Sequence, residues 1–367
     1  MFFLKQVTIL ALLLLATLLV LPAVTMASPA VICHDVNGDG VIDTLDVQQV
    51  AAHITAATYD PSFDVNGDGQ VDILDLSSVA AAWHSQLGLC MPGSSGAVWN
   101  DVSSWVYQLT GYQNNQLDQI GGSNFQLAVV DLARDGSSSY FTASEIGAVQ
   151  ATGKIVLAYF EIGAIEDYRP EWPLVAPDLM LGPVSGWPGE QYVKYWDPRW
   201  WPIVRGRVDQ AIAAGFDGAY LDMIVTYEEI PANAAGTNRA DLASKMVDLI
   251  DQTSRYAKSI DPNFKIVPQN APELHTWPKY LPAIDGLGME ELYYLATDQP
   301  CSQSWCVENR ANTAAVKNAG KLVLTVDYAN QTANIGDAYT RSRAAGFVPH
   351  CTVVALNIMR VNPGWDP

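Results

Sequence analysis

The chain has 367 residues, of which 49% are hydrophobic and 16% charged, and its formal net charge at pH 7 is -19. With 20 Lys and Arg against 39 Asp and Glu, it would repel phosphate backbones, so the composition excludes a nucleic-acid-binding protein. The length fits one large domain with a second, small one, and the acidity favours a neutral or cationic ligand.

Residues 1–27 are predicted to be a secretory signal peptide. Lys5 precedes the apolar run ILALLLLATLLVL, and the small-residue stretch Thr25-Met26-Ala27 fits a cleavage site. The alternative is an uncleaved membrane anchor, but the apolar run is short for a bilayer span. We therefore expect a secreted, extracellular protein without stable membrane insertion.

The five cysteines fit an oxidising compartment. Cys33 and Cys90 bracket a compact segment, so a bridge between them is one hypothesis. A bridge between Cys301 and Cys306 would close a short loop. The pairing among Cys301, Cys306 and Cys351 stays open at this level.

An internal duplication follows the signal segment. DVNGDGVIDTLDVQQVAAHI, which begins at Asp35, recurs 29 residues later as DVNGDGQVDILDLSSVAAAW, which begins at Asp64. Each copy carries side-chain oxygens at loop positions 1, 3, 5, 9 and 12, a backbone carbonyl at position 7, and a glycine at the sharp turn of position 6. The expected ligands are Asp35, Asn37, Asp39, Val41, Asp43 and Asp46, then Asp64, Asn66, Asp68, Gln70, Asp72 and Asp75. Two bound Ca²⁺ ions are predicted; the alternative, an acidic solvated loop, does not explain why both copies agree at every ligand position.

This pair of loops resembles a type I dockerin over residues 31–90. No full helix precedes either loop, and position 12 is Asp where sensor EF-hands have Glu, which argues against a calcium switch. The resemblance implies a cohesin domain of a scaffold protein as partner and places Thr44-Leu45 and Ile73-Leu74 at the surface that faces it. It also implies that the two calcium ions are structural and that the module unfolds without them.

A Pro/Gly/Ser-rich linker is predicted at residues 91–97, and residues 98–367 have the length of a (β/α)₈ TIM barrel. The predicted fold class is therefore α/β, with the barrel preceded by a small all-α calcium-binding domain. The candidate strands are LAVVDLA (127–133), IVLAYFEI (155–162), YVKYWDP (192–198), GAYLDM (218–223), KIVPQNA (265–271), GLGMEEL (286–292), LVLTVDY (322–328) and TVVALNI (352–358). An open doubly wound sheet is the alternative, but no Gly-rich phosphate motif follows the first strand.

Polar residues close these runs and would converge on one mouth of a parallel barrel. They are Asp131, Glu161, Asp197, Asp222, Asn270, Glu290, Asp327 and Asn357. The set holds no His or Cys, and the chain has neither HExxH nor GxSxG, so zinc hydrolysis and serine-esterase chemistry lose their support. Two carboxyl groups with separated pKa values would instead suit glycoside hydrolysis, without a catalytic cofactor.

The stretches GKIVLAYFEIGAIEDYRPEW, VKYWDPRWWPI, GFDGAYLDMIVTYEEI, VPQNAPEL and GMEELYY resemble glycoside hydrolase family 114, the endo-α-1,4-polygalactosaminidase-like TIM barrels, over most of residues 98–360. The resemblance implies a catalytic pair of Asp222 and Glu290 and an amino-sugar polysaccharide as substrate. Many bacterial relatives read SIGEAEDYR where this chain has EIGAIEDYR, which moves a carboxylate to Glu161.

The expected substrate-binding residues are Asp131, Glu161, Asp197, Asn270, Asp327 and Tyr328. Buried ion pairs with Arg134 or Lys154 are the alternative for Asp131 and Glu161, and a structural hydrogen bond is the alternative for Asn270. Because neighbouring strand residues face opposite sides, only one of Glu290 and Glu291 can enter the mouth. At the level of function, the alternatives are a glycosidase on a cell-wall polysaccharide and a non-catalytic carbohydrate-binding barrel.

Overall fold

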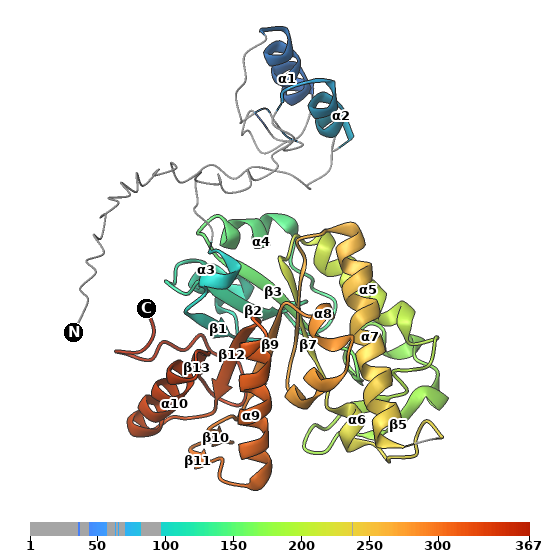
Figure 1. Ribbon diagram of the computed structural model, residues 1–367, viewed down its shortest axis with the longest axis vertical. Coiled ribbons are helices and arrows are strands. Elements are labelled where there is room, and N and C mark those ends of the chain that lie inside the picture. The colour runs from blue at the N-terminus through green and yellow to red at the C-terminus, as the bar shows by residue number, and fades with distance from the viewer. Residues whose placement is uncertain are drawn as a thin grey trace, which may run out of the picture. The chain divides into compact units, whose positions relative to one another are not determined.

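The computed structural model describes residues 36, 44–56, 63, 65, 70–81, 97–236 and 238–367. The chain divides into two compact units, Met1–Cys90 and Met91–Pro367 (Figure 1). In the described part of the chain, no helix is both long enough and apolar enough to cross a bilayer.

The first unit contains helices α1 (Thr44–Ala56) and α2 (Ile73–Ala81). Val50, Val65 and Val79 are buried together and join the helices through an apolar core. The exposed positions at the helix starts are Leu45, Ile73 and Leu74, at 50%, 62% and 56% exposure. The expected loop-exit residues are thus at the surface, as a docking role requires.

Four of the expected calcium ligands fall on described residues. Asp46 and Asp75 lie in the first turns of α1 and α2 and are fully buried, which suits carboxylates directed into a cation loop. Asp75 Oδ2 accepts from the Asp72 amide at 2.7 Å, and Gln70 is exposed. The other expected ligands lie outside the described residues: Asp35, Asn37, Asp39, Val41, Asp43, Asp64, Asn66 and Asp68. The same holds for Cys33 and Cys90.

The second unit is built on eight parallel strands. They are β1 (Trp105–Tyr107), β2 (Leu127–Asp131), β3 (Ile155–Glu161), β7 (Gly218–Asp222), β8 (Lys265–Pro268), β9 (Gly286–Glu290), β12 (Leu322–Asp327) and β13 (Val348–Cys351). Their hydrogen-bonded orders are β1-β2-β3-β7-β8 and β9-β12-β13, and a parallel bridge between Gln269 and Gly288 joins β8 to β9. Within residues 97–236 and 238–367 no backbone ladder joins β1 to β13, but the Trp105 indole N–H donates to the Val348 carbonyl at 2.9 Å.

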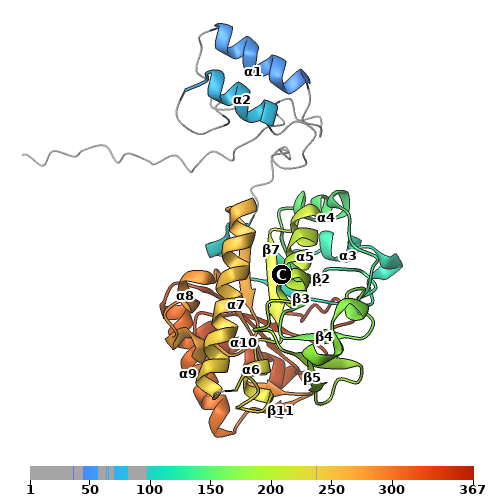
Figure 2. The same ribbon diagram turned by 90° about the vertical axis from the view of Figure 1, so that its right-hand side faces the viewer.

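Helices surround these strands (Figures 1 and 2). They are α3 (Asp118–Gly121), α4 (Ala143–Gln150), α5 (Trp201–Ala213), α6 (Thr226–Glu229), α7 (Arg239–Ile260), α8 (Tyr280–Ala283), α9 (Ser304–Asn318) and α10 (Thr332–Ala344). The starts of two are set locally: Thr142 and Glu145 form a capping box on α4, and the Asn238 side chain accepts from the Asp241 amide at α7. Further 3₁₀ turns lie at Trp99–Asp101, Gln113–Asn115, Trp172–Leu174, Pro177–Leu179 and Pro272–Thr276.

Both faces of the parallel strands are buried, which explains why the sequence shows continuous apolar runs. In β2, for example, Ala128 and Val130 pack in the core beneath the helices, while Leu127 and Val129 join a second, inner core. Tyr220 also belongs to the inner core, and a Cβ at Gly288 would meet its hydroxyl oxygen at 1.9 Å. Glycine is therefore required at position 288 for β9 to pass this ring.

Two of the predicted strands are wrong. The run 192–198 was expected in the barrel, but β6 (Glu190–Val193) pairs antiparallel with β4 (Ala164–Glu166) and β5 (Met180–Pro183) in a separate small sheet. The run 352–358 is irregular, because the strand ends at Cys351. The first strand, β1, was not predicted.

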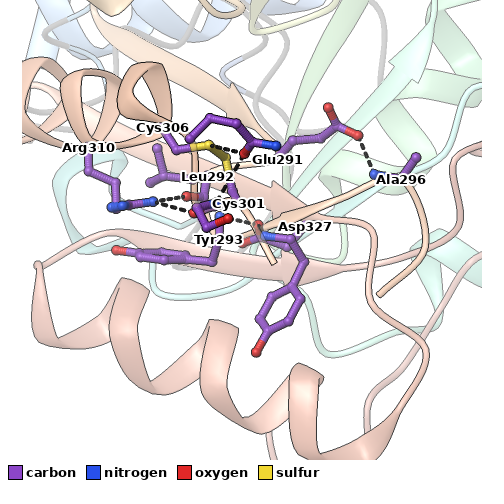
Figure 3. Close-up of a disulfide and its surroundings, with 11 residues drawn as sticks. Glu291, Leu292, Tyr293, Ala296, Cys301, Cys306, Arg310 and Asp327 are labelled. Atoms are coloured by element: carbon purple, nitrogen blue, oxygen red, sulfur yellow. Dashed lines mark hydrogen bonds between the residues drawn. A yellow bond between two sulfur atoms is a disulfide. The ribbon is translucent and has the colours of Figure 1, made fainter. Parts of the chain in front are cut away.

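A disulfide joins Cys301 to Cys306, and Cys351 is a buried free cysteine. As Figure 3 shows, the bridge lies beside the segment that follows β9 and contains the short strands β10 (Tyr294–Leu295) and β11 (Gln299–Pro300). Arg310 donates to the carbonyls of Leu292 and Cys301, at 3.0 and 3.2 Å. The bridge and this arginine thus tie the start of α9 to the segment behind Glu290.

Reduction of this disulfide is expected to lower the free energy of unfolding by about 2 kcal/mol, because the bridge closes a loop of only a few residues. The measurement is guanidinium unfolding with and without a reductant. A Cys301→Ser/Cys306→Ser variant is the control, since the reductant should no longer shift its midpoint. An unchanged midpoint for the unsubstituted protein would contradict this expectation.

Candidate active site

A cavity of about 650 Å³ opens at the carboxyl ends of the parallel strands. Of the residues predicted for the site, it is lined by Asp131, Glu161, Asp222, Asn270, Glu290 and Tyr328. They come from β2, β3, β7, β9 and the residues after β8 and β12. The small sheet of β4, β5 and β6 adds further walls through Glu166 and Glu190, and the exposed Trp187 stands beside them.

Asp222 ends β7 and accepts three hydrogen bonds. Tyr159 donates its hydroxyl to Oδ2 at 2.6 Å, and the Met223 amide donates to Oδ1 at 2.6 Å. Gln269 Nε2 donates to the same Oδ1 at 3.2 Å. Burial raises the pKa of Asp222, whereas the bonds from Tyr159 and Met223 favour its ionised form.

Glu290 ends β9 and is held by three side chains. Its Oε2 accepts from Gln269 Nε2 at 2.6 Å and from Asn270 Nδ2 at 3.0 Å, and its Oε1 accepts from the Tyr328 hydroxyl. Burial and the negative charge of Asp222 raise the pKa of Glu290 to about 7. At neutral pH this carboxyl is therefore partly protonated, as a general acid needs to be.

Gln269 bridges the two carboxyl groups. Its Nε2 lies 3.2 Å from Asp222 Oδ1 and 2.6 Å from Glu290 Oε2, so these two oxygens are at most 5.8 Å apart, the sum of the two distances. Tyr107 holds the amide from behind by donating its hydroxyl to Gln269 Oε1 at 2.9 Å. The pair of acids is thus set at a defined short separation.

The peptide backbone is left-handed at the residues that follow Asp222, Asn270 and Glu290. Met223 has φ 59°, Glu291 has φ 55°, and the consecutive residues Asn270 and Ala271 have φ 65° and 52°. Non-glycine residues occupy this region at a cost, and such residues cluster at functional sites. Glu291 also lines the cavity, so the expectation that only one of the two residues enters the mouth is wrong. The Glu291 carboxyl accepts from the Ala296 amide, however, and it is Glu290 that engages the other acid through Gln269.

Asp131 belongs to a buried ion cluster whose centre is Arg169. Arg169 donates to both oxygens of Asp131 at 2.9 Å, and to Glu166 at 2.7 and 2.9 Å. Burial alone would raise the pKa of Glu166, but the charge and hydrogen bonds of Arg169 outweigh it and lower this pKa to about 2. Asp131 is thus in a buried ion pair, the alternative to substrate binding, but its partner is Arg169. Arg134 binds Glu145 instead, and Lys154 donates to backbone carbonyls.

Glu161 and Glu190 line the same cavity without such compensation. Their two carboxyl groups are hydrogen-bonded to each other. Burial and neighbouring acids raise the pKa of Glu161 well above its usual range, and that of Glu190 to about 8. The raised pKa of Glu190 favours the protonated form of this carboxyl at neutral pH.

Two residues predicted to bind substrate do not line the cavity. Asp197 is bound by Arg199 at 2.8 Å outside it, because the run that contains it is not one of the eight parallel strands. Asp327 is buried, and its Oδ1 accepts from the amides of Tyr293 and Tyr294 at 2.7 and 2.8 Å. Burial raises the pKa of Asp327 to about 7. Its place is behind the segment that follows Glu290, where it fixes the backbone (Figure 3).

Sequence reasoning missed four residues that build the site: Tyr159, Gln269, Arg169 and Glu190. Tyr159 was detectable, since it lies two residues before Glu161 and so on the same face of β3. Gln269 directly precedes Asn270 at the end of β8, but no pattern marks its bridging role. Among the described residues, no group of three His, Cys, Asp or Glu side chains is arranged to hold a metal ion.

Comparison of the sequence with family models gives two matches. The model for glycoside-hydrolase family GH114 matches residues 91–364, and that for the dockerin type I domain matches residues 33–82. An uncharacterized protein of Deinococcus radiodurans is 36% identical over 275 residues, which cover 74% of this chain and 87% of that protein. One of Methanocaldococcus jannaschii is 32% identical over 278 residues, or 71% and 78% of the two chains.

Solved structures show the same fold for the second unit. The glycoside hydrolase domain of PelA from Pseudomonas aeruginosa superposes with a TM-score of 0.58 at 15% identity, over 71% of this chain and 98% of that one. Aspergillus fumigatus Ega3, solved in complex with galactosamine, gives 0.56 at 17% identity, over 72% and 97%. The family match, the relatives and the carboxyl-lined cavity agree: this chain belongs to glycoside-hydrolase family GH114 and carries a type I dockerin domain before its hydrolase domain.

Proposed function

We propose that the protein is a secreted, endo-acting glycosidase that cleaves an amino-sugar polysaccharide of the α-1,4-galactosamine type. The observation that carries this proposal is the pair of strand-end acids, Asp222 and Glu290, joined by one Gln269 amide in the cavity. Membership of GH114 supports the reaction class. The galactosamine in the Ega3 complex supports the sugar, as does the chain's net charge of -19, which attracts a cationic polymer.

The short separation of the two acids supports a retaining mechanism. Carboxyl groups about 5–5.5 Å apart are typical of retaining glycosidases, and those about 6.5–9.5 Å apart of inverting ones. Asp222 is the nucleophile: its oxygen bonds to the anomeric carbon while the glycosidic C–O bond breaks, and Glu290 gives its proton to the departing oxygen. Glu290 then takes a proton from water, whose oxygen displaces Asp222 and releases the sugar with its original configuration.

Neighbouring groups hold the two acids in place for these steps. Tyr159 and the Met223 amide orient Asp222 and favour its ionised form, since both donate hydrogen bonds to it. Asn270 and Tyr328 hold Glu290, and Asn270 also accepts from the Glu290 amide at 3.0 Å. Asp131 acts through Arg169 as part of the wall, and the exposed Trp187 offers a ring face for stacking on a sugar.

The test is incubation of the purified protein with acetylated and deacetylated α-1,4-galactosamine polymers. Mass spectrometry of the fragments should show internal cleavage, and NMR of the first-formed reducing ends should show retained α configuration. Cleavage of only a plant cell-wall polymer would replace the proposed substrate. Binding of polymer without new reducing ends would identify a non-catalytic carbohydrate-binding domain.

Activity is expected to fall as the pH rises through about 7, because Glu290 must be protonated for the first step and its pKa is raised to about 7. On the acid side, activity should fall where Asp222 becomes protonated. The measurement is kcat/KM across pH, and the apparent values belong to the coupled pair. Activity that stays constant from neutral pH to pH 9 would exclude Glu290 as the acid.

The remaining architecture completes the proposal. The eight parallel strands close into a (β/α)₈ barrel, residues 1–27 direct export, and residues 91–97 link the barrel to residues 31–90. Residues 31–90 bind a cohesin domain of a scaffold protein through a surface that includes the exposed Leu45, Ile73 and Leu74. Two Ca²⁺ ions held by the duplicated loops stabilise this module; the buried Asp46 and Asp75 fit such loops, and calcium has no part in catalysis.

Chelation of calcium is expected to unfold residues 31–90 and to leave polysaccharide cleavage unchanged, because the two units of the chain are compact on their own. The measurement is limited proteolysis and circular dichroism with EDTA, alongside an assay of reducing ends. Restoring calcium should restore protease resistance. Loss of activity together with the first unit would show that the units are coupled.

A further inference from the structure

Each acid of the proposed catalytic pair has one oxygen that accepts two N–H hydrogen bonds. Asp222 Oδ1 accepts from the Met223 amide at 2.6 Å and from Gln269 Nε2 at 3.2 Å. Glu290 Oε2 accepts from Gln269 Nε2 at 2.6 Å and from Asn270 Nδ2 at 3.0 Å. Because a carboxylate oxygen has two lone pairs, neither of these oxygens has one left for a substrate or a proton.

The orientation of the two amide side chains follows from their other hydrogen bonds. Asn270 Oδ1 accepts from the Glu290 backbone amide at 3.0 Å, so its N–H groups face Glu290 Oε2. Tyr107 donates to Gln269 Oε1 at 2.9 Å, so the N–H groups of Gln269 face both acids. The opposite orientation would place Gln269 Oε1 against two carboxylate oxygens, which repel it. Gln269 and Tyr107 are buried, so packing also keeps them in place.

The second oxygen of each acid accepts one hydrogen bond, and in both cases the donor is a tyrosine. Tyr159 donates to Asp222 Oδ2 at 2.6 Å, and Tyr328 donates to Glu290 Oε1. Within residues 97–236 and 238–367, no second donor reaches either oxygen. All four side chains line the cavity. Each of these two oxygens therefore has one lone pair left for a group in the cavity.

We propose that Asp222 Oδ2 and Glu290 Oε1 are the reacting atoms, and that Tyr159 and Tyr328 are the positioning residues that act on them. The inference rests on the proposed function, since it assigns atoms of the same reaction. In the first step Asp222 Oδ2 bonds to the anomeric carbon while the glycosidic C–O bond breaks, and the proton on Glu290 Oε1 passes to the departing oxygen. In the second step a water oxygen bonds to that carbon, its proton passes to Glu290 Oε1, and the bond to Asp222 Oδ2 breaks.

Each tyrosine donates to the oxygen on which negative charge appears. In the first step the charge appears on Glu290 Oε1, which Tyr328 holds, and in the second it returns to Asp222 Oδ2, which Tyr159 holds. A hydrogen bond to a charged oxygen is stronger than one to a neutral oxygen. Tyr328 should therefore assist formation of the glycosyl-enzyme, and Tyr159 its hydrolysis.

The charged groups around the pair do not change when a tyrosine loses its hydroxyl. Arg169 lines the same cavity but is bound to Asp131 and Glu166. A hydroxyl that donates to a carboxylate favours its ionised form, so loss of that hydroxyl raises the pKa of the acid. The acids that face Asp222 or Glu290 are Glu161 from β3, Glu166 from β4, Glu190 from β6, Glu229 from α6, and Glu291.

The experiment compares Tyr159→Phe and Tyr328→Phe with the unsubstituted full-length protein. NMR of isotope-labelled carboxyl carbons, assigned with Asp222→Asn and Glu290→Gln, follows each acid without substrate. Tyr159→Phe should raise chiefly the pKa of Asp222, and Tyr328→Phe chiefly that of Glu290, each by about one pH unit.

Kinetics with the galactosamine polymer should show the same division. Tyr159→Phe should move the acid side of the kcat/KM profile to higher pH, and Tyr328→Phe the alkaline side, with the opposite side unchanged in each. Mass spectrometry of the protein during turnover separates the two steps. Tyr159→Phe should raise the fraction of glycosyl-enzyme, and Tyr328→Phe should lower it.

Tyr220→Phe is the matched control. Tyr220 belongs to the inner core, and its buried hydroxyl has no hydrogen-bond partner among the described residues, so neither acid should change its pKa. Circular dichroism checks that each variant folds. The inference is overturned if either tyrosine variant leaves the pKa of its acid unchanged, or if Tyr220→Phe shifts it equally. Shifted pKa values without cleavage of the galactosamine polymer would overturn the proposed substrate, whereas cleavage with unshifted values would overturn this inference alone.

Discussion

Asp222→Asn and Glu290→Gln are each expected to lower kcat by at least about 10³-fold while the fold is retained. Asparagine at 222 cannot form the glycosyl ester, and glutamine at 290 cannot give a proton to the departing oxygen. Both replacements keep the size of the side chain, so Tyr159, Gln269 and their neighbours stay packed. The measurement is single-turnover and steady-state cleavage of the galactosamine polymer, with circular dichroism on each variant.

The control variants carry the same kinds of substitution, Asp to Asn and Glu to Gln, at acids outside the cavity. Asp101→Asn and Glu308→Gln alter exposed acids outside the cavity and should leave kcat unchanged. Turnover within about tenfold of the unsubstituted enzyme would remove the residue concerned from the catalytic pair. The two roles also differ: a substrate with a good leaving group needs no acid, so it should restore the first step in Glu290→Gln but not in Asp222→Asn.

Arg169→Met is expected to lower the free energy of unfolding by about 3–5 kcal/mol, because it leaves two buried carboxylates without their counter-charge. Arg169 is 6% exposed and binds both Asp131 and Glu166, which are 3% and 5% exposed. Methionine fills much of the space, so the effect reports charge more than volume. Guanidinium or urea unfolding of the isolated hydrolase domain would measure it.

The companion variant for this prediction is Arg199→Met. Arg199 also joins two carboxylates, Asp178 and Asp197, but its side chain is 52% exposed. Water replaces the lost ion pair there, so we expect a much smaller shift of the midpoint. Similar shifts for the two variants would mean that the buried cluster is no more important to stability than a surface pair.

The strand ends were the part of the fold that the sequence could predict. A strand buried on both faces is a short apolar run, and a polar residue marks where it leaves the core, as at Asp222 and Glu290. The same signal misled at 192–198, because Tyr192 and Val193 are equally apolar in an antiparallel strand of another sheet. With three residues, β1 is too short for any periodicity to show.

The contacts between distant segments could not be predicted in this way. Arg169 lies 38 residues from Asp131, in an excursion between two strands of the sheet, and nothing in the sequence ties it to that acid rather than Arg134. Asp327 has the same position in its strand as Asp222 in β7, yet backbone amides of a neighbouring segment capture its carboxyl. A strand-end acid therefore reaches the cavity only where no nearby backbone amide binds its carboxyl group.

We call Met223, Ala271 and Glu291, whose backbone is left-handed, the joints of the cavity. They bear on how such a hydrolase can be recombined with a relative. Each sits one residue behind a polar group of the cavity, and each holds a conformation that an ordinary side chain resists. A loop grafted from a relative that starts after the joint would let the backbone relax and swing the acid away. Engineers who recombine these enzymes should therefore place crossover points inside the strands, so that every acid travels with its own joint.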